Sequence, residues 1–427
     1  MARKMKDSGI EWIGEIPEGW ETCLYKYCCS VQPGYPFDSA KFSNSSTDGF
    51  PLIRIRDITS GEIQTYYTDS YDSSYIITAG DLLVGMDGDF NVRWWNNFDA
   101  LLNQRCCRII EKGRVSRRFI YYVLPFTLQY INTLTYATTV KHLANGDILN
   151  SFIAFPSLSI QKNITCYLDK NCSNIDSILS KTRASIEEYK KLKQAVITQA
   201  VTKGVRGERE MEDSGVDWIG EIPKEWDIIK SSRIIKTTQN GLSRRDLEKS
   251  EGQIILKLKN ITSDGKIDYS FLNRITLSQN ELNTYALTTG DFLFVRVNGS
   301  KSLVGKCAIF EAISEIVAYN DHIIRVKLSN QCYNRFFLWY LYSCCGKAEI
   351  DLHTSTAAGQ YTISGDGLRD ITLVFPPIDE QKEIADYLDA KCAEIDGLIA
   401  KKEQLVKELE SYKKSLIYEV VTGKREV

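Results

Sequence analysis

Residues 7–20 read DSGIEWIGEIPEGW and residues 213–226 read DSGVDWIGEIPKEW, so ten of the 14 positions are identical at an offset of 206 residues. Further along, Gln161-Lys-Asn-Ile164 and Gln381-Lys-Glu-Ile384 each open a long helical pattern and lie 220 residues apart. The chain therefore has two similar halves, each with a globular block followed by a long helix. Such a repeat predicts a pseudo-twofold protein, which suits a partner with twofold symmetry such as duplex DNA.

The composition sets the class of protein. A chain of 427 residues exceeds the size of a single core, so we expect at least two domains. The formal net charge is −2, so any DNA binding must depend on local patches. No segment resembles a signal peptide or a membrane span, which predicts a soluble, cytoplasmic protein without a membrane partner. The 12 cysteines form no C-x-x-C motif, so we expect reduced thiols and no metal site.

Four blocks follow from the matching landmarks. We expect a globular domain over 1–155, a long helix over 156–204, a second globular domain over 205–375 and a second long helix over 376–427. In the globular blocks, residues 52–59 (LIRIRDIT) match residues 255–262 (ILKLKNIT), and both alternate apolar and basic residues. This alternation predicts a strand with one buried face in each copy. We therefore expect an α+β fold, with mixed α/β domains whose sheets are largely antiparallel.

The helical blocks carry apolar residues at heptad spacing. One seam position of the first helix is assigned to Ile175, Thr182, Tyr189 and Val196 and the other to Ile178 and Leu192, while Leu179 and Ile186 widen the stripe. In the second helix the two positions are assigned to Ile395, Leu409 and Leu416, and to Leu398, Leu405 and Tyr412. Heptads of this length favour a two-helix coiled coil over two helices that each pack only on their own domain.

The sequence fits none of several common catalytic motifs. Between Gly299 and Gly305 there are five residues, where a phosphate-binding loop requires four, and Cys307 stands where that loop needs Ser or Thr. The acidic pair Asp379-Glu380 is better explained as helix-terminal charge than as a nuclease centre. No amino-methyltransferase tetrapeptide is present. The sequence therefore predicts a chain without catalytic residues.

Candidate DNA-binding residues lie where a similar framework carries dissimilar loops. Residues 87–95 (DGDFNVRWW) match the place of residues 296–301 (RVNGSK), and residues 138–142 (TTVKH) match residues 358–362 (AGQYT). Arg, Asn and Asp are side chains that read base edges, although each single loop could equally be a solvated turn. The residues assigned to DNA binding are Arg54, Arg56, Asp89, Asn91, Arg93, Lys141, His142, Lys257, Lys259, Arg296, Asn298, Ser300, Lys301, Gln360 and Tyr361.

With these features, the chain resembles the specificity subunit of type I restriction–modification enzymes over essentially its whole length. The resemblance rests on the repeated Trp12–Pro17 and Trp218–Pro223 segments, on Pro156 and Pro376 before the long helices, and on similar helix ends at 200–204 (AVTKG) and 420–424 (VVTGK). It implies two target recognition domains that read a bipartite, asymmetric DNA site. It also implies an antiparallel coiled coil that sets the gap between the half-sites.

The same resemblance implies partners and cofactors. Two modification subunits would carry out S-adenosylmethionine-dependent adenine methylation, and two motor–nuclease subunits would use ATP and magnesium. No cofactor would bind this chain itself. The alternatives are a coiled-coil scaffold whose domains bind protein instead of DNA, and a self-sufficient methyltransferase or nuclease, for which no cofactor motif is found.

Overall fold

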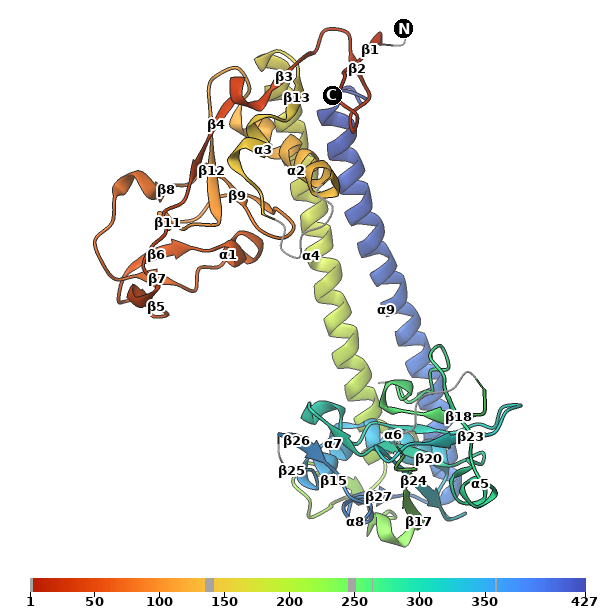
Figure 1. The fold of residues 1–427 in the computed structure, drawn as a ribbon. Coiled ribbons are helices and arrows are strands. Elements are labelled where there is room, and N and C mark those ends of the chain that lie inside the picture. Colours follow the sequence, from red (N-terminus) through yellow and green to blue (C-terminus); the bar gives the residue numbers. More distant parts are fainter. Residues whose placement is uncertain (1–2, 135–141, 245–250, 263, 358) are drawn as a thin grey trace. The chain divides into compact units, whose positions relative to one another are not determined.

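The computed structural model describes residues 3–134, 142–244, 251–262, 264–357 and 359–427. The chain divides into unit 1, which comprises Met1–Thr182 and Gln404–Val427, and unit 2, which comprises Arg183–Glu403. Each unit contains one globular part and segments of two long helices, α4 (Leu158–Lys203) and α9 (Ile378–Val421) (Figure 1). None of the helices in the described ranges combines the length and the apolar character that crossing a membrane requires.

Unit 1 combines short helices with largely antiparallel sheets. Its sheets have the strand orders β1-β2, β10-β9-β12-β4, β5-β7-β6-β11-β8 and β13-β3, and the pair β6–β11 is parallel. The elements are β1 (Met5–Asp7), β2 (Glu15–Pro17), β3 (Glu21–Leu24), β4 (Cys29–Pro33), β5 (Phe42–Ser43), β6 (Phe50–Ile53), α1 (Ile55–Ser60), β7 (Tyr66–Tyr67), β8 (Ile76–Ile77), β9 (Leu82–Gly85), β10 (Val92–Trp94), β11 (Ala100–Leu102), β12 (Cys106–Glu111), α2 (Arg117–Leu134), α3 (Asn145–Leu149) and β13 (Phe152–Phe155).

Unit 2 repeats this plan. Its sheets have the orders β14-β15, β16-β27, β17-β24-β20-β22, β19-β18-β23 and β21-β26-β25, and β18–β23 is the parallel pair. The elements are β14 (Met211–Asp213), β15 (Glu221–Pro223), β16 (Asp227–Lys230), β17 (Ile235–Asn240), β18 (Gln253–Leu256), β19 (Asn273–Ile275), α5 (Gln279–Tyr285), β20 (Phe292–Val295), β21 (Val297–Asn298), β22 (Cys307–Ile309), β23 (Val317–Tyr319), β24 (Ile323–Leu328), α6 (Asn334–Tyr342), α7 (Cys344–Leu352), β25 (Ser355–Ala357), β26 (Gln360–Thr362), α8 (Gly365–Arg369) and β27 (Thr372–Phe375).

The expected strands over 52–59 and 255–262 are wrong in their second halves. β6 ends at Ile53 and the helix α1 follows, while β18 ends at Leu256 and a single 3-10 turn follows. The backbone N–H of Arg54 donates to the carboxylate of Asp57 at 2.8 Å, and that of Lys257 donates to the amide oxygen of Asn260 at 2.9 Å. These buried caps satisfy the backbone locally, and so end the strand despite the alternating pattern.

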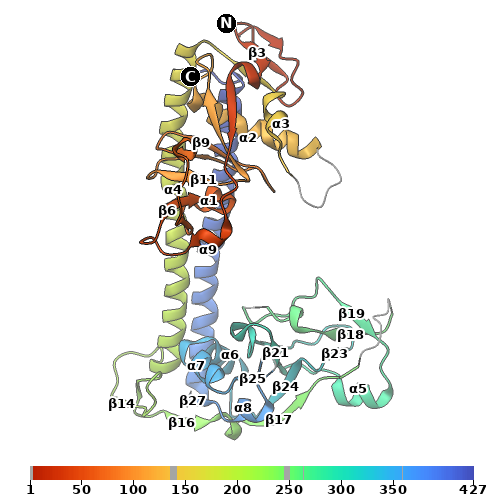
Figure 2. The same ribbon diagram turned by 60° about the vertical axis from the view of Figure 1, so that its left-hand side comes forward.

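Each globular part is anchored to the long helix that follows it by a buried glutamine. Gln161 accepts from the backbone N–H of Ser116 at 2.8 Å and donates to Pro156 O at 2.8 Å. Gln381 makes the same pair of bonds, with the N–H of Tyr333 and with Pro376 O, both at 2.8 Å. In unit 2, α6 and α7 lie against the long helices, whereas β18, β19 and β23 lie away from them (Figure 2).

The long helices pair within each unit, but through a different seam from the expected one. In unit 1, Leu179 is 5% exposed and belongs to one apolar core with Ile175 and Leu416, whereas Ile178 is 47% exposed. Leu192, Leu405 and Tyr412 are likewise exposed, contrary to their expected seam positions. The apolar stripe is three heptad positions wide. A partner helix covers only two of these positions. Here it covers the position of Ile175 and Thr182 and the position of Leu179 and Ile186, and it leaves the position of Ile178 exposed.

Two lysines stand in this seam and pair with aspartates. Lys413 Nζ lies 2.6 Å from Asp176 Oδ1 in unit 1, and Lys193 Nζ lies 2.7 Å from Asp396 Oδ2 in unit 2. The two lysines are 220 residues apart in the sequence, and so are the two aspartates. Each pair joins α4 to α9. Along α4 the paired residues are Asp176 and then Lys193, whereas their partners on α9 are Lys413 and Asp396, whose numbers decrease. The helices are therefore antiparallel. A charged residue in a coiled-coil seam fixes the register, because any other register buries it unpaired.

Candidate nucleic-acid interface

In unit 1, several connections leave the sheets at one edge. The end of β6 lies beside the end of β11 through the parallel pair Ile53–Leu102. The end of β9 lies beside the start of β12 through the pair Gly85–Cys106. The segments after β6, after β9 and between β11 and β12 therefore meet. We call this region edge 1, defined by residues 54–56, 86–91, 103–105 and 142.

Edge 1 holds an exposed cluster of one acid and two basic groups. His142 Nδ1 lies 2.7 Å from Asp87 Oδ1, and because a carboxylate only accepts, Nδ1 carries the proton and donates. Arg105 Nη1 lies 3.6 Å from the same oxygen, and the Arg105 backbone has a left-handed φ of 73°. The side chains of Arg105 and His142 are 57% and 48% exposed. The cluster can thus offer donors and an acceptor to a ligand at the same time.

The residues of unit 1 that were expected to bind DNA differ from one another in exposure and in the groups that they contact. Asp89 and Asn91 are exposed on the segment after β9. Arg54 lies over the ring of Phe42, with its guanidinium 5.8 Å from the ring centre. Arg93 instead donates from Nη2 to Thr59 O at 2.7 Å and from Nε to Ile58 O, so it caps the end of α1. Lys141 lies outside the described residues.

Burial shifts two acidic groups near edge 1. It raises the pKa of the Asp57 carboxyl, and the backbone N–H of Arg54 and the charge of Arg56 oppose that shift. It also raises the pKa of the Cys106 thiol to about 12, so this thiol stays protonated at neutral pH. Among the described residues, no group of three or more His, Cys, Asp or Glu could hold a metal ion. The chemistry that edge 1 can supply is hydrogen bonding and charge.

Unit 2 has an equivalent edge 2, defined by residues 257–259, 296–301, 320–322 and 360–361. The end of β18 lies beside that of β23 through the parallel pair Leu256–Tyr319, and the end of β20 lies beside the start of β24 through Val295–Ile323. Here the strands β21, β26 and β25 form an additional antiparallel ribbon. A two-stranded ribbon such as β25–β26 has the dimensions that enter a DNA major groove.

Side chains from several strands and turns meet at edge 2. Arg296 Nη1 donates to Asp321 O at 3.3 Å, and the N–H of Ser300 donates to Asn298 Oδ1 at 3.0 Å. Lys301 Nζ lies 3.9 Å from a carboxylate oxygen of Asp351.

The other expected residues of unit 2 differ in exposure. Gln360 is exposed near the tip of the β25–β26 hairpin, whereas Tyr361 is half-buried against the unit 2 core. Lys259 lies over the ring of Phe271, with Nζ 5.4 Å from the ring centre, and Lys257 heads the cap described above.

Backbone hydrogen bonds show that the two edges share one framework. Met86 N donates to Arg105 O at 2.8 Å, and Arg296 N donates to His322 O at 2.8 Å. Leu143 N donates to Met86 O at 2.7 Å, and Ile363 N donates to Arg296 O at 3.0 Å. These bonds match three connections of edge 1 to three of edge 2, and the equivalent caps at Arg54 and Lys257 match the fourth, while the side chains that the connections present differ. By this correspondence, Asp87 and His142 of edge 1 match Val297 of β21 and Thr362 of β26.

The residues assigned to DNA binding from the sequence did not include Asp87, although its loop was a candidate, and sequence reasoning missed Arg105, Asp321 and His322 altogether. Asn103 and Asn320 hold equivalent places, since each forms an isolated parallel bridge, with Tyr35 and Leu242 respectively. Arg105 and His322 each lie two residues after these asparagines, so the repeat carried a usable signal. The residues that sequence reasoning did place at the edges come from separate segments, and the fold brings them together as expected for a shared binding surface. Which of them contact a ligand stays a prediction.

Residues 17–188 and 223–408 match the family described as the type I restriction modification DNA specificity domain. The chain is 27% identical over 411 residues to the type I restriction enzyme EcoBI specificity subunit of Escherichia coli, covering 93% of this chain and 84% of that protein. It is 25% identical to the StySPI specificity subunit of Salmonella potsdam, covering 96% of this chain and 90% of that one.

Two solved structures show the same fold. One is a chain from work on complex assembly and conformational transition of the type I R-M system, with a TM-score of 0.71 and 15% identity over 96% of this chain and 99% of that chain. The other is the HsdS subunit from Thermoanaerobacter tengcongensis, with a TM-score of 0.50 and 16% identity over 96% and 98% of the two chains.

Proposed function

The chain belongs to the type I restriction–modification DNA specificity family, and we propose on this basis that it reads a bipartite, asymmetric site in double-stranded DNA. Unit 1 reads one half-site and unit 2 reads the other. The observation that carries the proposal is the pair of edges, which have equivalent backbone hydrogen bonds and different side chains. A shared framework with different reading groups is what two unlike half-sites require.

The chemistry of each edge supports base reading. Asp87 accepts hydrogen bonds, as from the cytosine amino group, while Arg105 donates to the acceptors of guanine. At edge 2, Gln360 at the hairpin tip offers the donor and acceptor pair that matches adenine. The net charge of −2 supplies little general attraction for phosphates, so tight binding would depend on partner subunits.

We propose that all catalytic steps, methylation and DNA cleavage alike, are carried out by other polypeptides. The relatives are named specificity subunits, and in our proposal this chain docks two modification subunits and two motor–nuclease subunits. S-adenosylmethionine, ATP and magnesium would bind to those partners. This division of labour agrees with the lack of catalytic motifs in the sequence.

The long helices offer a docking surface for such partners. Ile178, Leu405 and Tyr412 of unit 1 are 47%, 41% and 50% exposed, and Leu192 of unit 2 is 47% exposed. All four stand at the same heptad position, beside the seam. Apolar residues kept exposed at regular spacing mark a helical surface that a partner covers. We expect Leu192→Ser to weaken capture of the modification subunits by at least tenfold without changing the unfolding of the chain.

Methylome sequencing tests the reading function. Cells that express this chain with its modification subunits should show adenine methylation in a two-part motif. Replacing residues 1–155 by the matching domain of another family member should change one half of the motif and keep the other half. A motif that changes in both halves, or does not change, would contradict one half-site per unit. A scaffold that binds only protein would leave the methylome without a two-part motif.

A further inference from the structure

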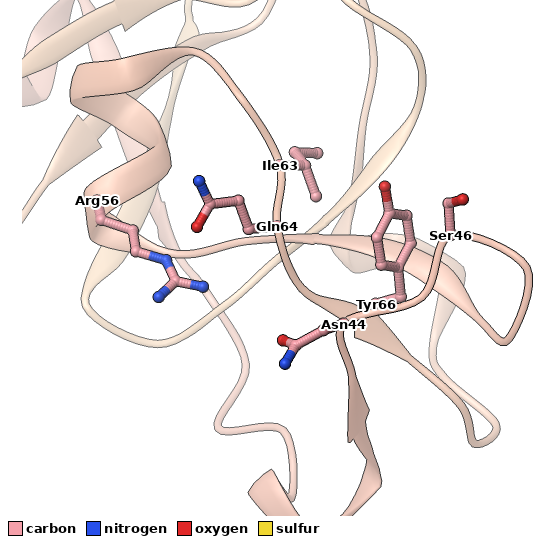
Figure 3. Close-up of a pocket in the computed structure, with 6 residues that line it drawn as sticks. All are labelled: Asn44, Ser46, Arg56, Ile63, Gln64 and Tyr66. Atoms are coloured by element: carbon pink, nitrogen blue, oxygen red, sulfur yellow. The ribbon is translucent and has the colours of Figure 1, made fainter. Parts of the chain in front are cut away.

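Unit 1 has a surface pocket of about 490 Å³ beside edge 1, which the candidate residues did not include apart from Arg56. It is lined by Asn44, Ser46, Arg56, Ile63, Gln64 and Tyr66, which come from the segment after β5, from α1, from the segment before β7 and from β7 itself (Figure 3). The pocket adjoins edge 1 because α1 follows β6 directly, and Arg56 belongs to both.

Two amides in this pocket have unused hydrogen-bonding capacity. Within the part of the chain that the structure describes, the side chains of Asn44 and Gln64 are exposed and hydrogen-bond no protein group. In Figure 3 these amides and the guanidinium of Arg56 lie on the same side of the segment that carries Gln64. An amide presents a donor and an acceptor in one plane, which is the pattern that pairs with the N6 and N7 atoms of adenine.

Arg56 is held in place rather than left free. Its Nη2 donates to the hydroxyl of the buried Thr65 at 3.0 Å, and its Nε lies 3.5 Å from Asp57 Oδ1. Half of the side chain remains exposed, at 50%. A guanidinium fixed on one side by two partners still offers its remaining N–H groups to the pocket. Its charge would also attract the phosphates beside a bound base pair.

The matched place in unit 2 is built differently. Lys259 corresponds to Arg56 and lies over the ring of Phe271, which is 65% exposed. An apolar ring with a lysine offers no paired donor and acceptor there. A framework position that carries polar reading groups in one half and an exposed ring in the other is expected where the two halves recognise different bases.

We propose that this pocket reads one base pair of the first half-site, with the amides of Asn44 and Gln64 set against the edge of an adenine. The proposal depends on the function proposed above and adds a specificity determinant to it. The apolar side chain of Ile63 would lie next to the thymine methyl group of the same base pair, where such contacts are favourable.

The test compares methylomes of cells that express the full chain, wild type or variant, with its modification subunits. In Asn44→Ala/Gln64→Ala we expect one base pair of the first half-site to relax, with discrimination there lowered about 5- to 140-fold, while the second half-site and the spacer stay the same. Gln64→Glu replaces the amide by an acceptor, so the preferred base at that position should change towards cytosine. A changed base preference cannot result from unfolding. Gln129→Ala removes an exposed amide of α2 that belongs neither to edge 1 nor to the pocket, so this matched control should leave both half-sites as they are.

Two results would overturn the proposal that this pocket reads a base pair. One is an unchanged first half-site in both variants. The other is weaker methylation at an unchanged motif together with lost capture of the modification subunits, which would make the pocket a protein-docking site. Both are distinct from failure of the proposed function, in which the wild-type complex itself would show no two-part motif.

Discussion

Ile178 and Leu179 are neighbours in the apolar stripe of α4, but only Leu179 is buried against α9. Replacing each of them by alanine tests which side of this stripe faces α9. Leu179 is 5% exposed in a core shared with Ile175 and Leu416, while Ile178 is 47% exposed. Truncating a buried leucine costs about 2–5 kcal/mol, from lost transfer free energy and from the cavity that remains. We therefore expect Leu179→Ala to lower the free energy of unfolding of unit 1 by about 2–4 kcal/mol.

The expected cost at Ile178 is much smaller. Full burial of isoleucine contributes about 1.5–3 kcal/mol, and close to half of this side chain is already in water. The higher helix propensity of alanine returns a few tenths of a kcal/mol. Ile178→Ala should therefore cost less than about 1 kcal/mol. The neighbouring position serves as a matched control, because both changes lie on the same turn of the same helix.

Urea unfolding followed by far-UV circular dichroism measures the two differences. Because the units can unfold separately, hydrogen exchange at the α4 amides should be followed as well. Protection should fall in Leu179→Ala and persist in Ile178→Ala. If the two variants lost equal amounts of unfolding free energy, or if Ile178→Ala lost more, the observed seam would be refuted. The seam predicted from the heptad pattern alone would then be the better description.

Three further changes test the anchors of the fold. Gln381→Leu leaves two buried backbone groups unpaired and should cost roughly 2–6 kcal/mol in urea unfolding, whereas the exposed Gln404→Leu should cost below about 0.5 kcal/mol. Asp57→Asn keeps the cap but removes a carboxyl group whose pKa is raised by burial. The folded wild type holds its proton more tightly than the unfolded chain does, so wild type should lose stability relative to this variant as pH rises from about 4. A stability difference that does not depend on pH would contradict this. Gly241→Ala sets a Cβ atom 2.1 Å from a backbone oxygen and should lower the thermal midpoint by an amount equivalent to about 1–3 kcal/mol, while Gly299→Ala, with open space around it, should not.

The repeated segments made the architecture predictable, because matching stretches in two copies must serve matching structural purposes. Gln161 and Gln381 illustrate this point. Their recurrence marked the helix starts in the sequence, and the structure shows both side chains satisfying a buried backbone N–H at 2.8 Å. The strands over 52–59 and 255–262 could not be judged in the same way. Alternation extends past Ile53, but the carboxylate of Asp57 accepts from the backbone N–H of Arg54, and this local cap ends the strand.

The candidate site was only partly predictable. Loops at equal places with unequal sequences pointed to both edges, and His142 and Arg296 do lie there. Arg93 looked identical to a base-reading arginine in the sequence, yet its donors are taken by the carbonyl groups at the end of α1. Gln64 drew no attention, because an exposed polar residue has no signature until the residues around it are known.

The sequence by itself determined that the chain has two related domains, that a long helix follows each, and that the two helices pair. Only the tertiary structure decided which apolar residues form the seam and which stay exposed. The physical reason is that a heptad pattern records which positions are apolar, whereas burial depends on which side the partner helix covers. Hydrogen-bonding groups such as those at Asp87, Arg105 and His142 likewise acquire a common role only when folding brings distant segments within a few ångströms.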